Sequence, residues 1–133
     1  MPIHLRIARP VSDLGRSVTM YQHGLGLVTV GQFENHEGFS GVMLAYPNSV
    51  YHFEFTVCHT HAITPTPTPE DLLVLDFPDL EQWRKARDRM LEAGSSEVVP
   101  FNPYWRKNGC TFEDHDGYRL VLEQDEWSAD EIG

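Results

Sequence analysis

Apolar and polar residues alternate in some segments of the chain and recur at helical spacing in others. Residues 3–9 alternate at period two, which is typical of a strand with one buried face. Apolar residues then recur at helical spacing at Leu14, Val18, Tyr21 and Leu25. Ser12 and Asp13 can cap the start of that helix with side-chain oxygens, and the glycines within 24–26 can end it. The pattern predicts a strand followed by a helix.

Three strand-like segments follow the predicted helix. They are residues 27–34, 41–46 and 51–59. The sequences between them, at 35–38 and 47–49, have the composition of turns. Residues 1–60 therefore predict a βαβββ module.

A proline-rich stretch separates this module from the rest of the chain. Residues 61–71 read HAITPTPTPED, and the alternating prolines remove backbone donors and favour an extended conformation. No helix or central strand can run through such a segment. We therefore expect a linker at 61–71.

The order of elements repeats after the linker. An apolar run at 72–77 predicts a strand, and Asp79 and Gly94 can begin and end a helix with an apolar face. Three short strands are predicted at 97–100, 109–113 and 118–123. The turn sequence at 114–117 suits a tight connection that uses its glycine. An internal duplication is the simplest interpretation, although periodicity alone leaves a ferredoxin-like domain and an open α+β sandwich as alternatives.

Charge and composition narrow the classes of partner. The 133 residues carry a formal net charge of -10, which repels phosphate backbones and anionic membranes. No segment comes close to the run of about 20 apolar residues that a membrane-spanning helix needs. The N-terminal sequence lacks the apolar run of a secretory signal. We expect a cytoplasmic protein that binds neither nucleic acid nor membranes.

Cysteine spacing and the acidic end of the chain carry further expectations. Cys58 and Cys110 lie far apart and outside any CxxC pair, so both are expected to be reduced and buried. Acidic residues concentrate in Glu123–Ile132, which is expected to be a solvated terminus and not a binding element.

Two motifs resemble the ends of a known superfamily. Residues 12–17, SDLGRS, followed by Tyr21 and the sequence GLGL at 24–27, are similar to the opening of the glyoxalase, bleomycin-resistance and extradiol-dioxygenase proteins, called the vicinal oxygen chelate superfamily. Residues 112–122, FEDHDGYRLVL, resemble its closing motif, with His115 in place of a proline. The resemblance implies an α+β fold in which two βαβββ modules form a curled eight-stranded mixed sheet around a cavity, with the helices outside.

This resemblance covers nearly the whole chain as a single domain. Module 1 corresponds to about residues 1–60 and module 2 to about 72–125, with the linker at 61–71 and an acidic tail at 126–133. Members commonly pair modules between subunits, so the resemblance also implies a homodimer.

Metal-dependent members hold a divalent ion with one His or Glu from the first and last strand of each module. The matching positions in this sequence are Arg6, Glu54, Leu72 and Val121. Arginine cannot ligate a cation, and the two aliphatic residues have no ligand atoms. Because such sites need about three protein ligands, we expect no metal and no other cofactor. The alternative is a displaced site with ligands from His52, Glu54, His59 and His61. These histidines could equally be exposed or hydrogen-bonded.

The residues at the first-module positions suggest a charge pair. Arg6 and Glu54 are predicted to form an ion pair, because an unpaired buried charge would cost several kcal/mol. Arg6 is also a candidate for binding an anionic ligand oxygen with its planar guanidinium. His52 shares a strand face with Glu54. His52 and Glu54 are the candidate catalytic residues, with His52 as a general base, although a strand histidine is more often structural.

Arg6, His52 and Glu54 are three of the candidate ligand-binding residues, and an aromatic segment supplies the others. Residues 101–106, FNPYWR, place two large aromatic rings and an amide beside prolines. Aromatic walls with a few polar groups are typical of small-molecule sites, which makes Asn102, Tyr104 and Trp105 candidates. Alternatively, Tyr104 and Trp105 cover the core edge or a dimer contact.

Two functions fit these features. The first is a metal-independent small-molecule binding protein of the glyoxalase and bleomycin-resistance type, with an unidentified ligand. The alternative is a metal-independent lyase or isomerase that acts on a small oxygenated substrate through Arg6, Glu54 and His52. A fold alone does not decide between them, so enzymatic activity stays open at this point.

Overall fold

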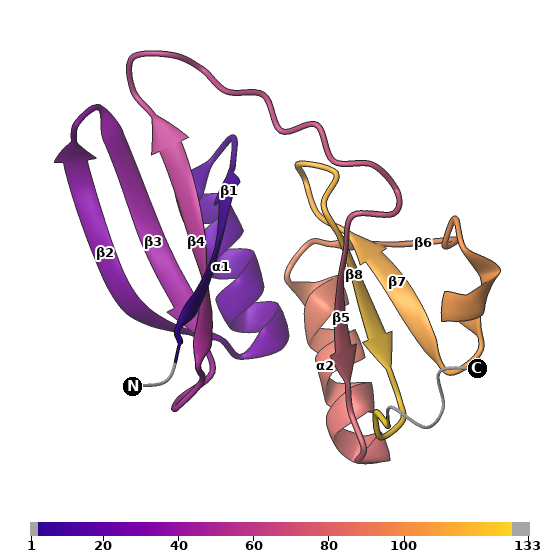
Figure 1. Ribbon diagram of the computed structural model, residues 1–133. Coiled ribbons are helices and arrows are strands. Elements are labelled where there is room, and N and C mark those ends of the chain that lie inside the picture. Colours follow the sequence, from indigo (N-terminus) through magenta and orange to yellow (C-terminus); the bar gives the residue numbers. More distant parts are fainter. Residues whose placement is uncertain (1–2, 129–133) are drawn as a thin grey trace. The chain divides into compact units, whose positions relative to one another are not determined.

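Each half of the chain folds around one α-helix and one four-stranded sheet (Figure 1). The computed structural model describes residues 3–128, and the chain divides into two compact units between Thr66 and Pro67. The first unit contains β1 (Leu5–Pro10), α1 (Leu14–Leu25), β2 (Val28–His36), β3 (Phe39–Ala45) and β4 (Tyr51–Cys58). The second contains β5 (Leu72–Asp76), α2 (Leu80–Glu92), β6 (Ser96–Val98), the 3-10 helix η1 (Pro103–Arg106), β7 (Gly109–Glu113) and β8 (Arg119–Glu123). The predicted βαβββ order is confirmed in both halves.

In the first unit, the strands lie in the order β1-β4-β3-β2. Strand β1 runs parallel to β4, and the other two pairs are antiparallel. Helix α1 begins after Asp13, whose Oδ1 accepts a hydrogen bond from the Arg16 amide at 3.0 Å. It ends at Gly26, which adopts the left-handed conformation with φ 75°. Both ends lie where the sequence predicted them.

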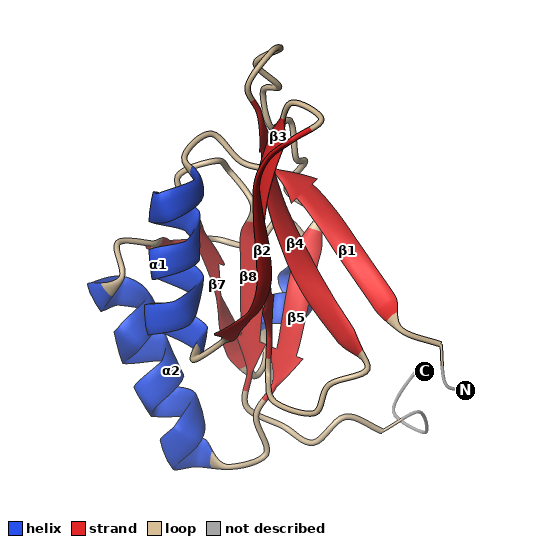
Figure 2. Cartoon of the chain, turned by 90° about the vertical axis from the view of Figure 1, so that its left-hand side faces the viewer, coloured by secondary structure: helices blue, strands red, loops and turns tan. Residues whose placement is uncertain are grey.

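The core of the first unit lies between α1 and one face of its sheet (Figure 2). Tyr21 on α1 contacts Phe55 on β4 edge-on, with ring centroids 4.8 Å apart. Other side chains buried in this core are Met20, Leu25, Leu27 and Leu44. Because side chains alternate along a strand, His52 and Glu54 project from the opposite face of β4.

In the second unit, the strands lie in the order β5-β8-β7-β6, with β5 parallel to β8. Asp79 caps α2, and the Trp83 indole Nε1 donates a hydrogen bond to the Leu122 carbonyl at 2.8 Å. This bond ties the helix to β8. The buried core residues are Ala86, Met90, Phe112, Leu120 and Leu122.

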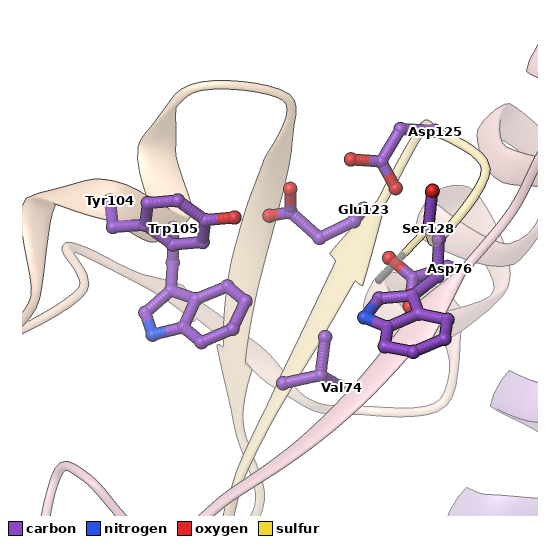
Figure 3. Close-up of a pocket in the computed structure, with 8 residues that line it drawn as sticks. Val74, Asp76, Tyr104, Trp105, Glu123, Asp125 and Ser128 are labelled. Atoms are coloured by element: carbon purple, nitrogen blue, oxygen red, sulfur yellow. The ribbon is translucent and has the colours of Figure 1, made fainter. Parts of the chain in front are cut away.

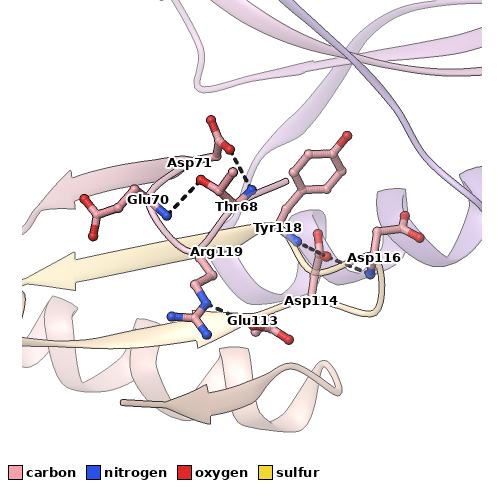
Figure 4. A network of polar contacts seen from close by, with 8 residues as sticks. All are labelled: Thr68, Glu70, Asp71, Glu113, Asp114, Asp116, Tyr118 and Arg119. Carbon is pink, nitrogen blue, oxygen red and sulfur yellow. Dashed lines mark hydrogen bonds and ion pairs between the residues drawn. The ribbon is translucent and has the colours of Figure 1, made fainter. Parts of the chain in front are cut away.

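A buried aspartate organises the turn between β7 and β8 (Figure 4). The Asp114 Oδ1 accepts hydrogen bonds from the amides of Asp116 at 2.9 Å and Tyr118 at 3.0 Å. Gly117 has φ 87°, a conformation that strains other residues, which confirms the predicted use of the glycine. Beyond the turn, Arg119 Nε donates to Glu113 Oε2 at 2.9 Å across the two strands.

The irregular segments follow the proline positions. Residues 59–71 contain no helix or strand, as predicted for the linker. Strand β6 ends at Val98 and not at Pro100, since proline cannot donate to a strand ladder. Residues 101–106 contain η1, because Asn102 Oδ1 accepts a hydrogen bond from the Tyr104 amide at 3.0 Å and Pro103 suits a first helical turn.

Both cysteines are free thiols, as expected from their spacing. The expectation that they are buried is wrong, since Cys58 and Cys110 are each partly exposed. Burial of part of the side chain nevertheless raises the pKa of the Cys110 thiol to about 11. That thiol is therefore protonated at neutral pH and a poor nucleophile.

Candidate functional site

A line of polar side chains crosses β1 and β4 in the first unit. The parallel register places Arg6 beside His52 and Ala8 beside Glu54. Arg6 Nη2 lies 3.4 Å from Glu54 Oε1, so the predicted ion pair is confirmed. Its two partners differ in environment, because the Arg6 side chain is 61% exposed and that of Glu54 only 10%.

His52 connects this pair to a second histidine. A hydrogen bond of 2.8 Å joins His52 Nδ1 and His4 Nε2. On its other side, His52 Nε2 lies 3.7 Å from Glu54 Oε1, which is too long for a hydrogen bond. Within the described part of the chain, both of these atoms are buried without a hydrogen-bond partner. The four residues His4, His52, Glu54 and Arg6 form what we call the first-unit cluster.

The positions at which the resemblance implies metal ligands do not suit a metal ion in this chain. Glu54 carries the carboxylate, but the guanidinium of Arg6 occupies the place beside it. On the second sheet, Val121 pairs with Val74 and is fully buried, and Leu72 pairs with Arg119. This donor set cannot hold a divalent cation.

The displaced metal site is not assembled either. His59 Nε2 forms a 2.7 Å hydrogen bond with Ser40 Oγ, and His61 is exposed. Between residues 3 and 128, no three His, Cys, Asp or Glu side chains gather in an arrangement that could hold a metal ion.

A pocket of about 320 Å³ opens on the second unit (Figure 3). Its lining consists of three carboxylates, three aromatic rings, a valine and a serine, and we call it the acidic pocket. The residues are Val74, Asp76, Tyr104, Trp105, Glu123, Asp125, Trp127 and Ser128. Two of the predicted ligand-binding residues, Tyr104 and Trp105, thus line a pocket. The third, Asn102, is not among the lining residues and serves as the cap of η1.

Strand pairing and one short helix position these side chains. The register of β5 and β8 places Asp76 directly beside Glu123. Helix η1 presents Tyr104 and Trp105 with their rings 4.9 Å apart and nearly perpendicular, at 84°. The Glu123 carboxylate points toward those two rings and away from its own strand (Figure 3). Tyr104 and Trp105 therefore come from a different element than the carboxylates of the acidic pocket.

A glycine on the neighbouring strand makes room for Glu123. Gly109 pairs with Glu123 across β7 and β8. A Cβ atom on Gly109 would lie 2.8 Å from Glu123 Oε1 and 2.1 Å from the Leu122 carbonyl oxygen. No side chain larger than hydrogen fits there without a backbone shift.

The carboxylates of the acidic pocket have perturbed acidities. Burial raises the pKa of Glu123 to about 7, and the negative charges of Asp125 and Asp76 add to the rise. Burial likewise raises the pKa of Asp76 to about 6, with a hydrogen bond and the charge of Asp125 as further causes. Glu123 is only 4% exposed, and its Oε1 has no hydrogen-bond partner among the described residues. Perturbed carboxylates in a pocket are a frequent mark of a functional site.

The expectation of a solvated terminus is wrong for its first part. Glu123 belongs to β8 and is buried, and Asp125, Trp127 and Ser128 line the acidic pocket. Residues 129–132, and most of the predicted tail at 126–133, lie outside the described residues. Strand parity could have indicated that Glu123 is buried, because Glu123 lies two positions after Val121 and shares its face of the strand.

The fold is shared with enzymes and resistance proteins. Over 94% of this chain and 88% of the other, it superposes on glyoxalase I of Leishmania major with a TM-score of 0.71 at 18% identity. The fosfomycin resistance protein FosX of Mesorhizobium loti gives a TM-score of 0.71 at 12% identity, over 95% of this chain and 94% of the other. This is the fold of the vicinal oxygen chelate superfamily, to which the sequence motifs pointed.

Sequence comparison gives a narrower assignment. Residues 5–56 match the YycE-like N-terminal domain and residues 70–124 the YycE-like C-terminal domain. The uncharacterized protein YycE of Bacillus subtilis is 38% identical over 118 residues, which cover 89% of this chain and 85% of that protein. Its crystal structure superposes with a TM-score of 0.88, over 95% of this chain and 92% of the other. The chain belongs to the YycE-like family.

The helices of the structure are too short to cross a bilayer. Within residues 3–128, no helix combines the length and the apolar character that a membrane span requires.

Proposed function

We propose that this chain is a metal-independent small-molecule binding protein and that its ligand occupies the acidic pocket. One observation carries the proposal: the carboxylate of Glu123 is buried in a pocket beside two aromatic rings, with Oε1 unpartnered among the described residues. Leaving a buried acceptor unsatisfied costs about 1–3 kcal/mol. A ligand that donates a hydrogen bond to this oxygen would recover that free energy.

The size and lining of the pocket support this proposal. Its volume of about 320 Å³ falls at the lower end of the usual range for small-molecule sites. Tyr104 and Trp105 provide aromatic surface, and the carboxylates provide a few polar groups that can fix a ligand's orientation. We also expect a cytoplasmic location, as the sequence suggested.

A specific observation favours a second candidate function. In the first-unit cluster, His52 Nε2 and Glu54 Oε1 are buried 3.7 Å apart without hydrogen-bond partners in the described chain. The exposed guanidinium of Arg6 stands beside them and could bind an anionic substrate oxygen. His52 could then move a proton as a general base or acid. This arrangement would suit a metal-independent lyase or isomerase.

A screen of small molecules distinguishes the two functions. Thermal-shift screening at pH 7.5, followed by calorimetry, should yield ligands that bind unmodified protein and are recovered chemically unchanged. Trp105→Ala should weaken their affinity about tenfold or more, since it removes a wall of the acidic pocket. Phe101→Ala is the matched control, because Phe101 is an exposed aromatic residue nearby that does not line the pocket.

The first-unit cluster needs its own readout. Conversion of a bound compound, followed by mass spectrometry and lost in His52→Ala, would support the lyase or isomerase instead. Binding that is unaffected by Trp105→Ala would contradict the assignment of the acidic pocket as the site.

A further inference from the structure

We infer that the acidic pocket binds a small organic cation, a molecule that carries a protonated or quaternary nitrogen. This inference rests on the proposed binding function and names the class of its ligand. It follows from the charge, the burial and the aromatic surface of the pocket.

The charge of the lining is entirely negative. Asp76 comes from β5, Glu123 from β8, and Asp125 from the segment after β8. No lysine, arginine or histidine is found among the described residues that line the pocket. Three carboxylates without a basic partner repel one another. Burial raises the pKa values of Asp76 and Glu123, and this repulsion adds to the rise. A bound cation would offset this repulsion.

Glu123 gives the second, independent indication. Its side chain is buried to more than nine-tenths, it points into the pocket, and its Oε1 has no hydrogen-bond partner within residues 3–128. Gly109, which has no side chain, leaves the space that Glu123 Oε1 occupies. At pH 8, above its pKa of about 7, the Glu123 carboxylate is mostly ionised and acts only as an acceptor, so its missing partner is a donor. A protonated nitrogen combines a donor with the opposite charge.

The aromatic side selects an organic cation over a metal ion. Trp105, Tyr104 and Trp127 line the same pocket, and the negative faces of such rings attract organic cations. Tryptophan and tyrosine rings offer no ligand atoms to a metal ion, and the three carboxylates do not form a metal-binding group among the described residues. Val74 adds an apolar wall that suits a carbon skeleton.

Three probes of similar size and different charge test the inference. Benzyltrimethylammonium carries a fixed positive charge, benzyl alcohol is neutral, and benzoate is negative. Calorimetry at pH 8 should show the cation binding at least tenfold more tightly than the neutral probe, and benzoate not binding. Glu123→Gln should weaken the cation about tenfold while leaving benzyl alcohol unchanged. Glu126→Gln is the matched control, because Glu126 is an exposed glutamate of the same segment that does not line the pocket.

The pH dependence gives a second readout. Benzyltrimethylammonium does not titrate, so any change of its affinity between pH 5 and 8 belongs to the protein. Affinity should rise across this range as Asp76 and Glu123 lose their protons. Other titratable groups beside Glu123 are Asp125, whose negative charge helps to raise the pKa of Glu123, the Tyr104 hydroxyl and the Cys110 thiol.

The possible outcomes separate the charge of the ligand from the proposed binding function. If benzyl alcohol or benzoate binds as tightly as the cation and Glu123→Gln changes nothing, the charge inference is wrong while the binding function stands. If Glu126→Gln weakens the cation as much as Glu123→Gln, the attraction comes from the overall negative charge, and the inference fails. If neither the probes nor the screened compounds bind, both proposals fail. Should Glu123→Gln not fold, Asp76→Asn replaces it, with the same expected loss.

Discussion

Glu54 and Glu123 are buried glutamates in different units, and their neighbours carry opposite charges. Glu54 lies against Arg6, whereas Glu123 shares its pocket with Asp76 and Asp125. The first arrangement gives a carboxylate a cation of its own unit as an ion-pair partner, and the second leaves a carboxylate without a positive partner among the residues that line the pocket. The charge of the neighbouring side chains thus distinguishes the Arg6–Glu54 ion pair from the candidate binding site at Glu123.

The raised pKa of Glu123 makes stability depend on pH. Its folded-state value of about 7 exceeds the ordinary 4.5, so the folded state holds the proton more tightly. Stability therefore falls as pH rises from the lower value through the higher. Glu123→Gln removes the charge, and we expect this variant to be more stable than the parent protein by about 1–2 kcal/mol at pH 8. The difference should vanish near pH 4.

Urea unfolding at both pH values measures this effect. Glu126→Gln again serves as the control, and it should leave the pH profile unchanged, since Glu126 is exposed. The quantity to compare is the free energy of unfolding of Glu123→Gln minus that of the parent protein. If this difference is smaller at pH 8 than at pH 4, the prediction is wrong.

The Arg6–Glu54 pair should show measurable coupling. A double-mutant cycle with Arg6→Met and Glu54→Gln is expected to give about 0.5–1.5 kcal/mol, more than a surface pair because Glu54 is buried. The control cycle uses Arg84 and Glu81, whose side chains are both exposed although their atoms are 2.9 Å apart. It should give about 0.3–0.5 kcal/mol. Equal coupling in the two cycles would show that burial of Glu54 adds nothing.

The sequence allowed part of each site to be predicted. Strand parity and the motif spacing were enough to pair Arg6 with Glu54, and aromatic composition was enough to select Tyr104 and Trp105. Glu123 and Asp125 were missed because a run of acidic residues near the end of a sequence usually indicates solvation. Strand parity indicates which face of β8 Glu123 occupies, but the environment of the two residues depends on neighbours from other strands and from η1.

Among the elements, β7 and β8 pack closely at Gly109, which leaves no room for a Cβ atom. We expect Gly109→Ala to destabilise the protein by about 3 kcal/mol or more, because the new Cβ would collide with the Leu122 carbonyl oxygen. Gly15→Ala is the matched control in α1, where the nearest atom to an added Cβ is 3.8 Å away. It should stabilise by about 0.5–1 kcal/mol. Thermal unfolding of both variants tests the contrast, and a neutral Gly109→Ala would mean that β7 can move away from β8.

The turn that joins these strands depends on one carboxylate oxygen. Asp114→Ala should cost about 2 kcal/mol, because it removes the acceptor of two amide hydrogen bonds and leaves those amides unpaired. Asp114→Asn keeps an oxygen at the same position and should cost less than half as much. Chemical unfolding compares the two variants. A similar loss in both would show that the charge, and not the hydrogen-bonding oxygen, stabilises the turn.

The order and type of the elements were predictable from the sequence, and their ends less so. Asp13 and Gly26 bound α1 where capping chemistry predicted them. Helix η1 was not predicted, because a single 3-10 turn is too short to have a periodic signature. Its formation depends on the Asn102 cap, a contact that composition alone does not distinguish from a loop.

At the scale of the whole molecule, each sheet has edges that no strand of its own unit covers. Strand β2 is at one edge of the first sheet, and its residues Val28 and Val30 are exposed. Exposed apolar edge strands favour association, so we predict a homodimer. Sedimentation equilibrium should give twice the 15.2 kDa chain mass, and Val30→Lys should shift the population toward monomer. A parent protein that sediments at 15.2 kDa would contradict the prediction.

The parallel pairing inside each unit also governs how the chain can fold during synthesis. Leu5 of β1 pairs with Tyr51 of β4, and Leu72 of β5 pairs with Arg119 of β8. In each unit the first strand is therefore synthesised well before the strand with which it pairs. The ribosome adds about 5–20 residues per second, so the first strand of each unit remains without its partner strand for roughly several seconds. Because such distant contacts form slowly, the hairpins and the helix of a unit can form early. We therefore expect the first strand of each unit to join its sheet last.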